Sequence, residues 1–324
     1  MNILAYLLQT YPSKPWDWKF ISANSNITID IIEKYPDKPW DWALISCNPN
    51  ITIDIIENYP SKPWKLHCVS KNPNITVQYV LNHSSNKSWK WKDIYEHTTF
   101  IMDFIDQNPR KRRNWFYISK NPNLEIEFVK LHFKKPWDWR YGISNNPNLT
   151  IQFIQDYPNI DWNWYYISKC PNITIEHIET YPDKPWDWYG ISSNPNITME
   201  FIERHPDKPW DWINISINPN ITIDIIQKYP DKPWNWDMIS IKCHLTLNII
   251  QKYPKIPWDC LSMNPNITIE FIEKYINHID FGYLSKNKFT FENTRMKKKE
   301  GFLLLELEYT FHKLMNLYVI NQYM

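Results

Sequence analysis

The residues best suited to chemistry form a basic run mixed with aromatic rings, "PRKRRNWFY" at 109–117. It contains Arg110, Lys111, Arg112, Arg113 and Trp115. Cationic side chains pair with phosphates and aromatic rings stack on bases, so this run could bind a nucleic-acid strand. The alternative interpretation is a solvated run of charge. These five residues are the candidate partner-binding site of the chain.

The charge balance of the whole chain favours the solvated run. Lys and Arg total 36 and Asp and Glu total 35, so no overall field attracts nucleic acid or an anionic membrane. A second stripe of cations that could contact phosphates recurs along the sequence, at Lys38, Lys62, Lys184, Lys208 and Lys232, with an Asp row beside it. Nucleic-acid binding is therefore the second hypothesis, and glycan binding by exposed tryptophans is the third.

No pattern of an enzyme, a cofactor site or a metal site is present. The nine His are not confined to one position of the repeat described below, and the five Cys include no C-x-x-C. With only four Gly, the chain has no Gly-rich phosphate loop. We therefore expect a non-catalytic protein without cofactor or metal. Cys170 and Cys243 each replace a repeat residue, which indicates a reducing compartment.

The N-terminus "MNILAYLLQTYP" lacks a basic segment and a small-residue cleavage site. It aligns with "ITIDIIEKYP" at 27–36, so we interpret it as a truncated repeat and not as a signal peptide. No stretch is long and apolar enough to span a bilayer. These features predict a cytoplasmic protein.

These candidate residues lie within a tandem repeat of roughly 24 residues, which is marked by tryptophan. Its first Trp recurs, with Arg113 in one slot, at Trp16, Trp40, Trp64, Trp89, Trp137, Trp162, Trp186, Trp210, Trp234 and Trp258. A fixed period in this range is typical of solenoids, because each repeat buries its apolar face only against its neighbours. The sequence predicts an all-α solenoid, or superhelix, of about twelve repeats.

Each repeat is predicted to contain two short helices. Asn-Pro-Asn forms a turn, Thr52 caps the first helix, and Pro60 ends it. The second helix is shorter, α or 3₁₀, and is expected to begin at a proline such as Pro39. The recurring Asn is expected to satisfy backbone groups of the turns.

The two tryptophans of "WDW" are two residues apart, so they point to nearly opposite sides of a helix. We expect the second Trp to share the core with the aliphatic residue before Ser. The first Trp, replaced once by Arg113, is expected to be half-buried over a groove, and the Asp between them to face solvent. Trp188→Ala should then cost more stability than Trp186→Ala. The predicted core residues are Trp18, Trp42, Ile45, Trp139, Ile143, Trp164, Trp188, Ile191, Trp212, Ile215 and Trp236.

The pattern Asn-Pro-x-Thr, short helix, Asp, second short helix resembles the leucine-rich variant repeat, as at Asn194, Pro195 and Thr198. That resemblance implies alternating α and 3₁₀ helices in a superhelix. This chain differs in placing Trp-Asp-Trp in the second helix, and it lacks the cysteine cluster that one such protein uses for iron–sulfur. The repeat sequence "NPNIT…YPDKPWDW…IS" is similar to the repeats of tandem-repeat proteins from mimivirus-like giant viruses. This resemblance implies a viral origin but no particular activity.

We predict a repeat domain over 1–291 and a capping helical segment over 292–324. The apolar stretch 302–320 would cover the last layer; a helix on a membrane surface is its alternative, suggested by Lys297, Lys298 and Lys299. A long array of repeats presents an extended surface to protein partners. The first hypothesis is therefore a monomeric protein–protein interaction scaffold, which a virus would direct at host proteins.

Overall fold

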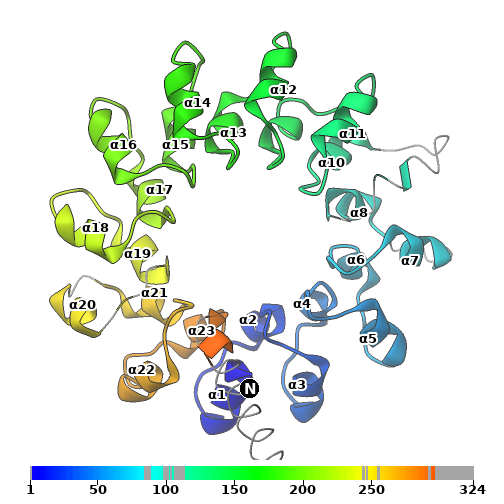
Figure 1. The fold of residues 1–324 in the computed structure, drawn as a ribbon. Helices are drawn as coiled ribbons and strands as arrows, with labels where there is room; N and C mark the ends of the chain where they lie inside the picture. Colours follow the sequence, from blue (N-terminus) through cyan, green and yellow to red (C-terminus); the bar gives the residue numbers. More distant parts are fainter. Residues whose placement is uncertain are drawn as a thin grey trace, which may run out of the picture. The chain divides into compact units, whose positions relative to one another are not determined.

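A computed structural model describes residues 2–83, 89–97, 102, 104–105, 114–242, 245, 247–253, 256–290 and 293–295 (Figure 1). Over these residues the protein consists of short helices without strands, repeated about 24 residues apart. The prediction of an all-α tandem-repeat protein is confirmed. The capping segment expected at 292–324 lies outside the described residues, apart from 293–295.

The helices alternate between two kinds, as the repeat predicts. The first helices are α1 (Ile3–Thr10), α3 (Ile29–Lys34), α5 (Ile53–Asn58), α7 (Val77–Asn82), α11 (Ile126–Leu131), α12 (Ile151–Asp156), α14 (Ile175–Thr180), α16 (Met199–Arg204), α18 (Ile223–Lys228), α20 (Leu247–Lys252) and α22 (Ile269–Lys274). The second helices are α2 (Trp18–Ala23), α4 (Trp42–Ser46), α6 (Leu66–Val69), α8 (Trp91–His97), α10 (Trp115–Ser119), η1 (Ile143–Asn145), α13 (Trp164–Lys169), α15 (Trp188–Ser192), α17 (Trp212–Ile217), α19 (Trp236–Lys242), α21 (Trp258–Ser262) and α23 (Phe281–Leu284).

The first helices begin and end where the sequence predicts. Thr52 Oγ1 accepts a hydrogen bond from Ile55 N at 3.3 Å, and Asp54 lies in the first turn, near the positive end of α5. The helix ends at Asn58, two residues before Pro60. The Thr cap is thus confirmed as the start signal.

The second helices begin later than expected, and the reason corrects the role of the Asp. Helix α4 begins at Trp42 and not at Pro39, because Asp41 is its N-cap. Its Oδ1 accepts from Ala43 N at 3.0 Å and from Leu44 N at 3.1 Å. The expectation that this Asp simply faces solvent is therefore wrong. It supplies acceptors for the first turn of the helix.

A buried serine near the end of most second helices links one repeat to the next, although Tyr95 takes its place in α8. Ser46 Oγ donates to Trp42 O at 2.6 Å and accepts from Lys65 N, in the next repeat, at 2.9 Å. The same pair of bonds occurs at Ser192, which bonds Trp188 O at 2.8 Å and Asp211 N at 3.0 Å. The hydroxyl has one donor and two acceptor lone pairs, which suits both bonds.

The recurring asparagine forms a second link, as predicted. Asn194 Nδ2 donates to Ser168 O at 2.9 Å, Cys170 O at 3.1 Å and Ile173 O at 2.9 Å, all in the preceding repeat. Its Oδ1 accepts from Asn196 N at 2.9 Å. Buried asparagines occupy this slot at Asn24, Asn48, Asn72, Asn121, Asn146, Asn194, Asn218, Asn264 and Asn287. The interpretation of these residues as a ladder that satisfies turn backbone is confirmed.

The burial order of the two tryptophans is opposite to the prediction. Trp186 is 9% exposed, and buried first tryptophans also occur at Trp16, Trp89, Trp137, Trp162 and Trp234. Trp188 is half-buried, as are the other second tryptophans predicted as core, Trp18, Trp42, Trp139, Trp164, Trp212 and Trp236. The aliphatic residues Ile45, Ile143, Ile191 and Ile215 are 0% exposed.

Packing between repeats explains this reversal. Trp186 meets the face of Trp164 in the preceding repeat edge-on, at 5.1 Å between centroids and 88°, and its indole N–H donates to Tyr181 O at 2.8 Å. Trp188 in turn receives the edge of Trp210 at 5.2 Å, and the Lys208 ammonium lies 4.9 Å from its ring. The first Trp is thus inserted between repeats, whereas the second is covered in part by a flexible lysine.

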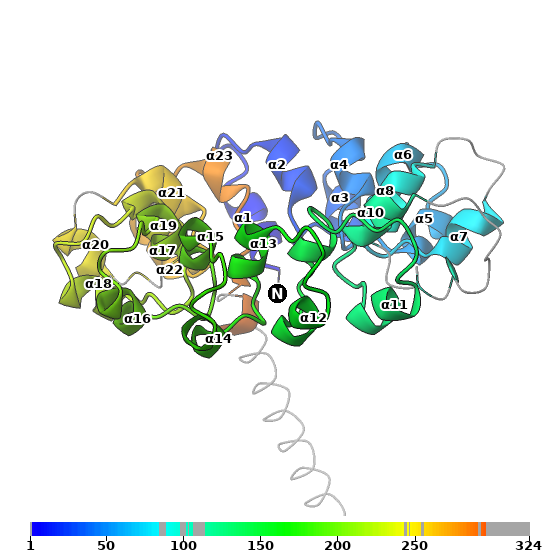
Figure 2. The ribbon, with the colours of Figure 1, turned by 90° about the horizontal axis from the view of Figure 1, so that it is seen from above.

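Contacts divide the chain into two bodies, described separately here. The central body is Trp18–Ile239; the terminal body contains Met1–Asp17 and Ser240–Met324. Within the central body, the closest contacts between helices join second helices of neighbouring repeats, α2 with α4, α4 with α6, α8 with α10, η1 with α13, α13 with α15 and α15 with α17. The first and second helices can be followed from above in Figure 2.

Helix α11 departs from the cap rule, which gives a first prediction. Its N-cap is the exposed Glu125, which makes no side-chain cap bond, whereas Thr150 Oγ1 caps α12 by accepting from Phe153 N at 3.2 Å. Glu125→Thr should therefore stabilise the protein by about 1 kcal/mol. Thermal and urea unfolding of the variant measure this gain. Glu125→Ala is the control and should not reproduce it, because alanine offers no acceptor; equal gains would refute the capping explanation.

Candidate interaction surface

The structure places only one residue of the predicted basic site. Arg110, Lys111, Arg112 and Arg113 lie outside the described residues. Trp115 is half-buried at the start of α10, and its ring packs against Trp137 at 4.7 Å and 80°. This tryptophan therefore serves the contact between repeats.

Three lysines of the predicted stripe cover tryptophans. Lys38, Lys208 and Lys232 place their ammonium groups 5.3, 4.9 and 5.7 Å from the rings of Trp18, Trp188 and Trp212. In each case the lysine belongs to the repeat that follows the tryptophan. The regular spacing of these lysines is thus explained by packing on the second Trp, which is a cation–π contact.

A different row of side chains stands out because packing does not require it. The residue after the second Trp is Lys19, Ala43, His67, Lys92 or Asp237 in five repeats, so the fold accepts small and charged residues there. In other repeats it is Phe116, Tyr165, Tyr189 or Ile213. We define the apolar row as these four residues together with Tyr141, which stands two residues after its tryptophan.

Most of the apolar row is exposed to solvent. The exposed fractions are 55% for Tyr189, 53% for Ile213, 51% for Tyr141 and 44% for Phe116, and Tyr165 is half-buried. Exposed apolar patches rimmed by polar residues often mark interaction sites. All five belong to consecutive second helices of the central body, α10 to α17, including the segment around η1.

Close packing of two helices brings part of the row together. The rings of Tyr165 on α13 and Tyr189 on α15 lie 6.1 Å apart at 31°. Gly190 permits this approach, because a Cβ at that position would lie 2.5 Å from Tyr165 O. A larger residue would push α15 away from α13 and separate the two rings.

Cations accompany the row, and acidic groups partly offset them. Lys120 lies 4.1 Å from the Phe116 ring, and Lys169 lies 5.1 Å from the Tyr165 ring. Burial lowers the pKa of the Lys169 ammonium. A hydrogen bond to the Asp211 carboxylate raises the pKa of the Tyr189 hydroxyl, because the proton of the phenol is held by the carboxylate.

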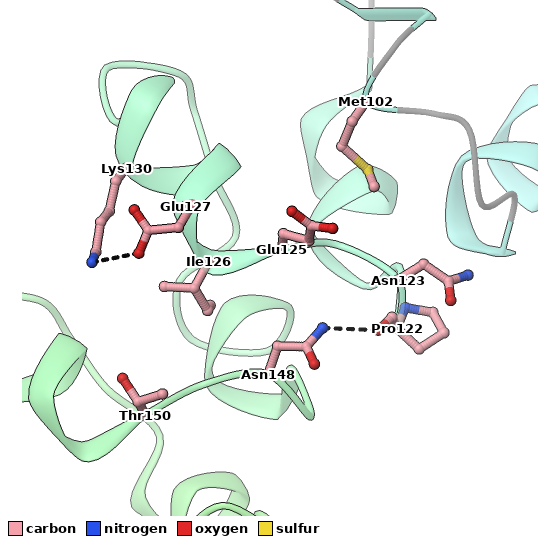
Figure 3. A pocket seen from close by; sticks show the side chains of 9 residues that line it. All are labelled: Met102, Pro122, Asn123, Glu125, Ile126, Glu127, Lys130, Asn148 and Thr150. Carbon is pink, nitrogen blue, oxygen red and sulfur yellow. Dashed lines mark hydrogen bonds and ion pairs between the residues drawn. The ribbon is translucent and has the colours of Figure 1, made fainter.

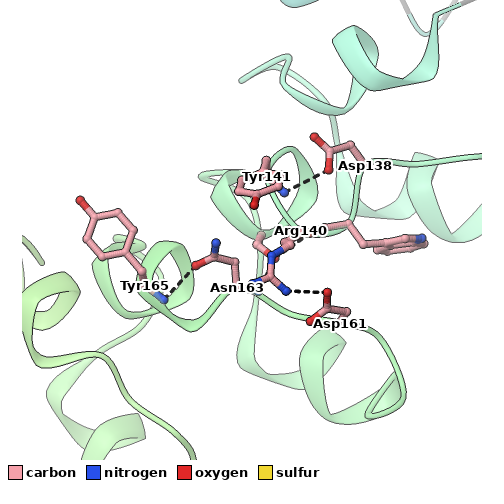
Figure 4. A network of polar contacts seen from close by, with 8 residues as sticks. Asp138, Arg140, Tyr141, Asp161, Asn163 and Tyr165 are labelled. Atoms are coloured by element: carbon pink, nitrogen blue, oxygen red, sulfur yellow. Dashed lines mark hydrogen bonds and ion pairs between the residues drawn. The ribbon is translucent and has the colours of Figure 1, made fainter.

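Figure 4 shows how the second helices present the middle of the row. Arg140 Nη1 lies 2.6 Å from Asp161 Oδ2, and the guanidinium is 5.8 Å from the Tyr141 ring. Asn163 Oδ1 caps α13 by accepting from Tyr165 N at 3.2 Å. The row is therefore a surface of rings bordered by paired charges.

A separate cavity of about 610 Å³ lies among first helices (Figure 3). Its lining includes Glu125, Glu127 and Lys130, and the Lys130 Nζ to Glu127 Oε1 distance is 2.8 Å. This hydrogen bond raises the pKa of Lys130. The Thr150 hydroxyl in the lining is used as a helix cap. The cavity thus offers an ion pair and turn amides, not an assembled nucleophile and base.

Two further findings concern the described part of the chain alone. There, no three His, Cys, Asp or Glu side chains gather as a metal site would require. Among the same residues, no helix has the length and apolarity needed to cross a membrane.

The apolar row was not predicted from the sequence, although a signal for it exists. Aligning the repeats shows that the slot after the second Trp changes from polar or small residues to aromatic and aliphatic ones between Phe116 and Ile213. Because these side chains are mostly exposed, packing between repeats does not require the change. Comparison with family models, with curated proteins and with solved structures finds no match to this chain.

Proposed function

We propose that this protein is a non-catalytic interaction scaffold, and that its apolar row binds an apolar segment of a protein partner. The observation that carries the proposal is the exposure of Phe116, Tyr141, Tyr189 and Ile213 in positions where other repeats hold polar or small residues. Aromatic rings with an adjacent arginine are the side chains that contribute most to protein interfaces.

A protein partner fits the row better than a nucleic acid or a glycan. The row ends in the aliphatic Ile213, and Ile217 lies on the same helix; they are 53% and 43% exposed and offer no stacking face to a base or a sugar. Arg140 is paired with Asp161, so it has less positive charge to offer a phosphate. The net charge of +1 also provides little attraction for a polyanion.

The solenoid arrangement is part of this proposal. Equivalent Ser, Asn and Trp contacts between successive repeats support stacking into a continuous array, and the resemblance to leucine-rich variant repeats agrees with it. The thiol of Cys170 fills a slot of the asparagine ladder, which supports a reducing, cytoplasmic compartment. A viral origin would make the partner a host protein.

The proposal predicts that peptides selected on this protein depend on the row. A phage-displayed library of random peptides is panned against the full chain, and the selected peptides are synthesised. Their affinity should fall at least about tenfold for the variant Tyr165→Ala with Tyr189→Ala, because two central rings are lost. Fluorescence anisotropy measures the affinity.

Phe20→Ala is the matched control, since Phe20 is an exposed ring on α2 outside the row, at 36% exposure. It should leave the affinity unchanged. Selected peptides that bind both variants equally would contradict the proposal. Tighter binding of oligo-thymidylate than of any peptide, with the same dependence on Tyr165 and Tyr189, would favour the nucleic-acid hypothesis instead.

A further inference from the structure

The N-terminal residues pack on the last repeat of the terminal body as a following repeat would. Trp16 meets the face of Phe281 at 4.9 Å and 89°, and Lys14 lies 5.3 Å from the same ring. Inside the central body, Trp40 meets Trp18 at 5.0 Å and 86°, and Lys38 lies 5.3 Å from that ring. The two contacts join equivalent positions of the repeat at nearly equal distances, with Phe281 in the place of a tryptophan.

The backbone link between repeats is also reproduced. Asp17 N donates to Ser285 Oγ at 3.0 Å, just as Asp41 N donates to Ser22 Oγ at 3.0 Å. Tyr11 lies 6.2 Å from the Phe281 ring, as Tyr35 lies 6.3 Å from Trp18. Residues 2–17 therefore supply the first helix and the Lys-Pro-Trp-Asp segment of a repeat. The turn that should precede them lies elsewhere in the sequence.

The C-terminal end supplies that missing first part, the turn. Asn287 Nδ2 donates to Ser262 O at 2.9 Å and to Asn264 O at 2.8 Å. Its Oδ1 accepts from Phe289 N at 2.7 Å, as Asn48 Oδ1 accepts from Asn50 N, and Phe289 is fully buried. Ile3 N lies 3.4 Å from Asn293 Oδ1, which joins the start of α1 to this segment. One repeat is thus assembled from both ends of the chain.

Helix α1 buries a large apolar surface in this composite repeat. Ile3, Leu4 and Leu7 are 0% exposed and Leu8 is 2% exposed. Removing these four aliphatic side chains from water favours docking of the helix. The segment is therefore held by more than its aromatic contact.

We propose that the edge formed by Phe281 and Ser285 is a docking site for a half-repeat, an aliphatic helix followed by Lys-Pro-Trp-Asp. Residues 2–17 fill it within one chain. The same site binds residues 2–17 of a second copy when the chain's own segment is displaced. Exchange follows from the geometry, because every contact is the general contact between repeats and none depends on which chain donates the segment.

The proposal is tested on the full chain by cross-linking. Tyr6 Oη lies 3.4 Å from Glu273 Oε1, so Tyr6→Lys places an amine that a carbodiimide can join to that carboxylate. Equal amounts of ¹⁵N-labelled and unlabelled chain are mixed, exposed briefly to partially denaturing urea, returned to buffer and cross-linked. Mass spectrometry identifies peptides joined between positions 6 and 273 and the isotope of each half.

Before urea, the joined peptides should carry one isotope, which reports docking within a chain. After urea, peptides of mixed isotope should appear, and their share should rise with protein concentration toward one half. The control, Tyr6→Lys with Glu273→Gln, should lose the joined peptide. Its absence from the Tyr6→Lys chain as well would overturn the docking site, and joined peptides that keep a single isotope after urea at every concentration would overturn the exchange.

Discussion

Trp186→Ala is expected to lower the free energy of unfolding by about 4 kcal/mol, the middle of the range for a buried Trp-to-Ala change. The indole is 9% exposed, inserts edge-on against Trp164, and donates its N–H to Tyr181 O at 2.8 Å. Its removal leaves a cavity between two repeats. It also takes one of two N–H donors from the Tyr181 carbonyl, which keeps its bond from Lys184 N at 3.1 Å.

The matched substitution is Trp188→Ala, which should cost about half as much. Trp188 is half-buried, and Lys208 and Trp210 can move toward the space that its ring leaves. Urea unfolding of both variants gives the comparison. Hydrogen exchange should show faster opening near residues 160–215 in each, because repeats contact only their neighbours. A larger cost at Trp188 would contradict the packing described here.

The sequence predicts what depends on neighbours in the chain. The Thr caps, the turn at Asn-Pro-Asn and the period of the repeat depend on local sequence, so the recurring residue pattern is enough to predict them. The burial order of the tryptophans depends on packing between repeats, which spacing along one helix does not determine. Only Arg113 suggested that the position of the first Trp is exposed to solvent. A substitution in a single repeat carries little weight against six buried tryptophans.

Variation misled the interpretation of the Asp in the same way. Lys65 occupies its slot in α6 and makes no cap bond, whereas Asn163 and Asp187 cap their helices. Because one repeat of an array can lose a cap and survive on its neighbours, substitution at Lys65 did not mean that the slot has no role. The composite terminal repeat was predicted only in part, since the truncated first repeat is visible but its neighbour is not.

Asn194→Ala is the second substitution with a large expected effect. The side-chain amide is fully buried and bonds three carbonyls of the preceding repeat and one amide of its own turn. Alanine removes these bonds, although Cys170 O keeps its bond from Ile173 N and Ile173 O keeps its bond from Asn196 Nδ2. A buried group that is left unsatisfied costs about 1–3 kcal/mol when water cannot replace the partner. Partial relaxation and water entry reduce the sum, so we expect a loss of about 3–4 kcal/mol.

The chain offers the converse substitution at Cys170, which stands in the same slot. Its Sγ lies 3.8 Å from Asn146 O and 3.7 Å from Leu149 O, the equivalents of two carbonyls that Asn194 binds. A thiol is a weak donor, so Cys170→Asn should stabilise the protein by about 1–2 kcal/mol. Urea unfolding of both variants against the parent chain tests the pair. Two results would contradict this role of the asparagine ladder: a loss for Asn194→Ala no larger than for an exposed substitution, or a lower free energy of unfolding for Cys170→Asn. The tryptophan contacts alone would then hold neighbouring repeats together.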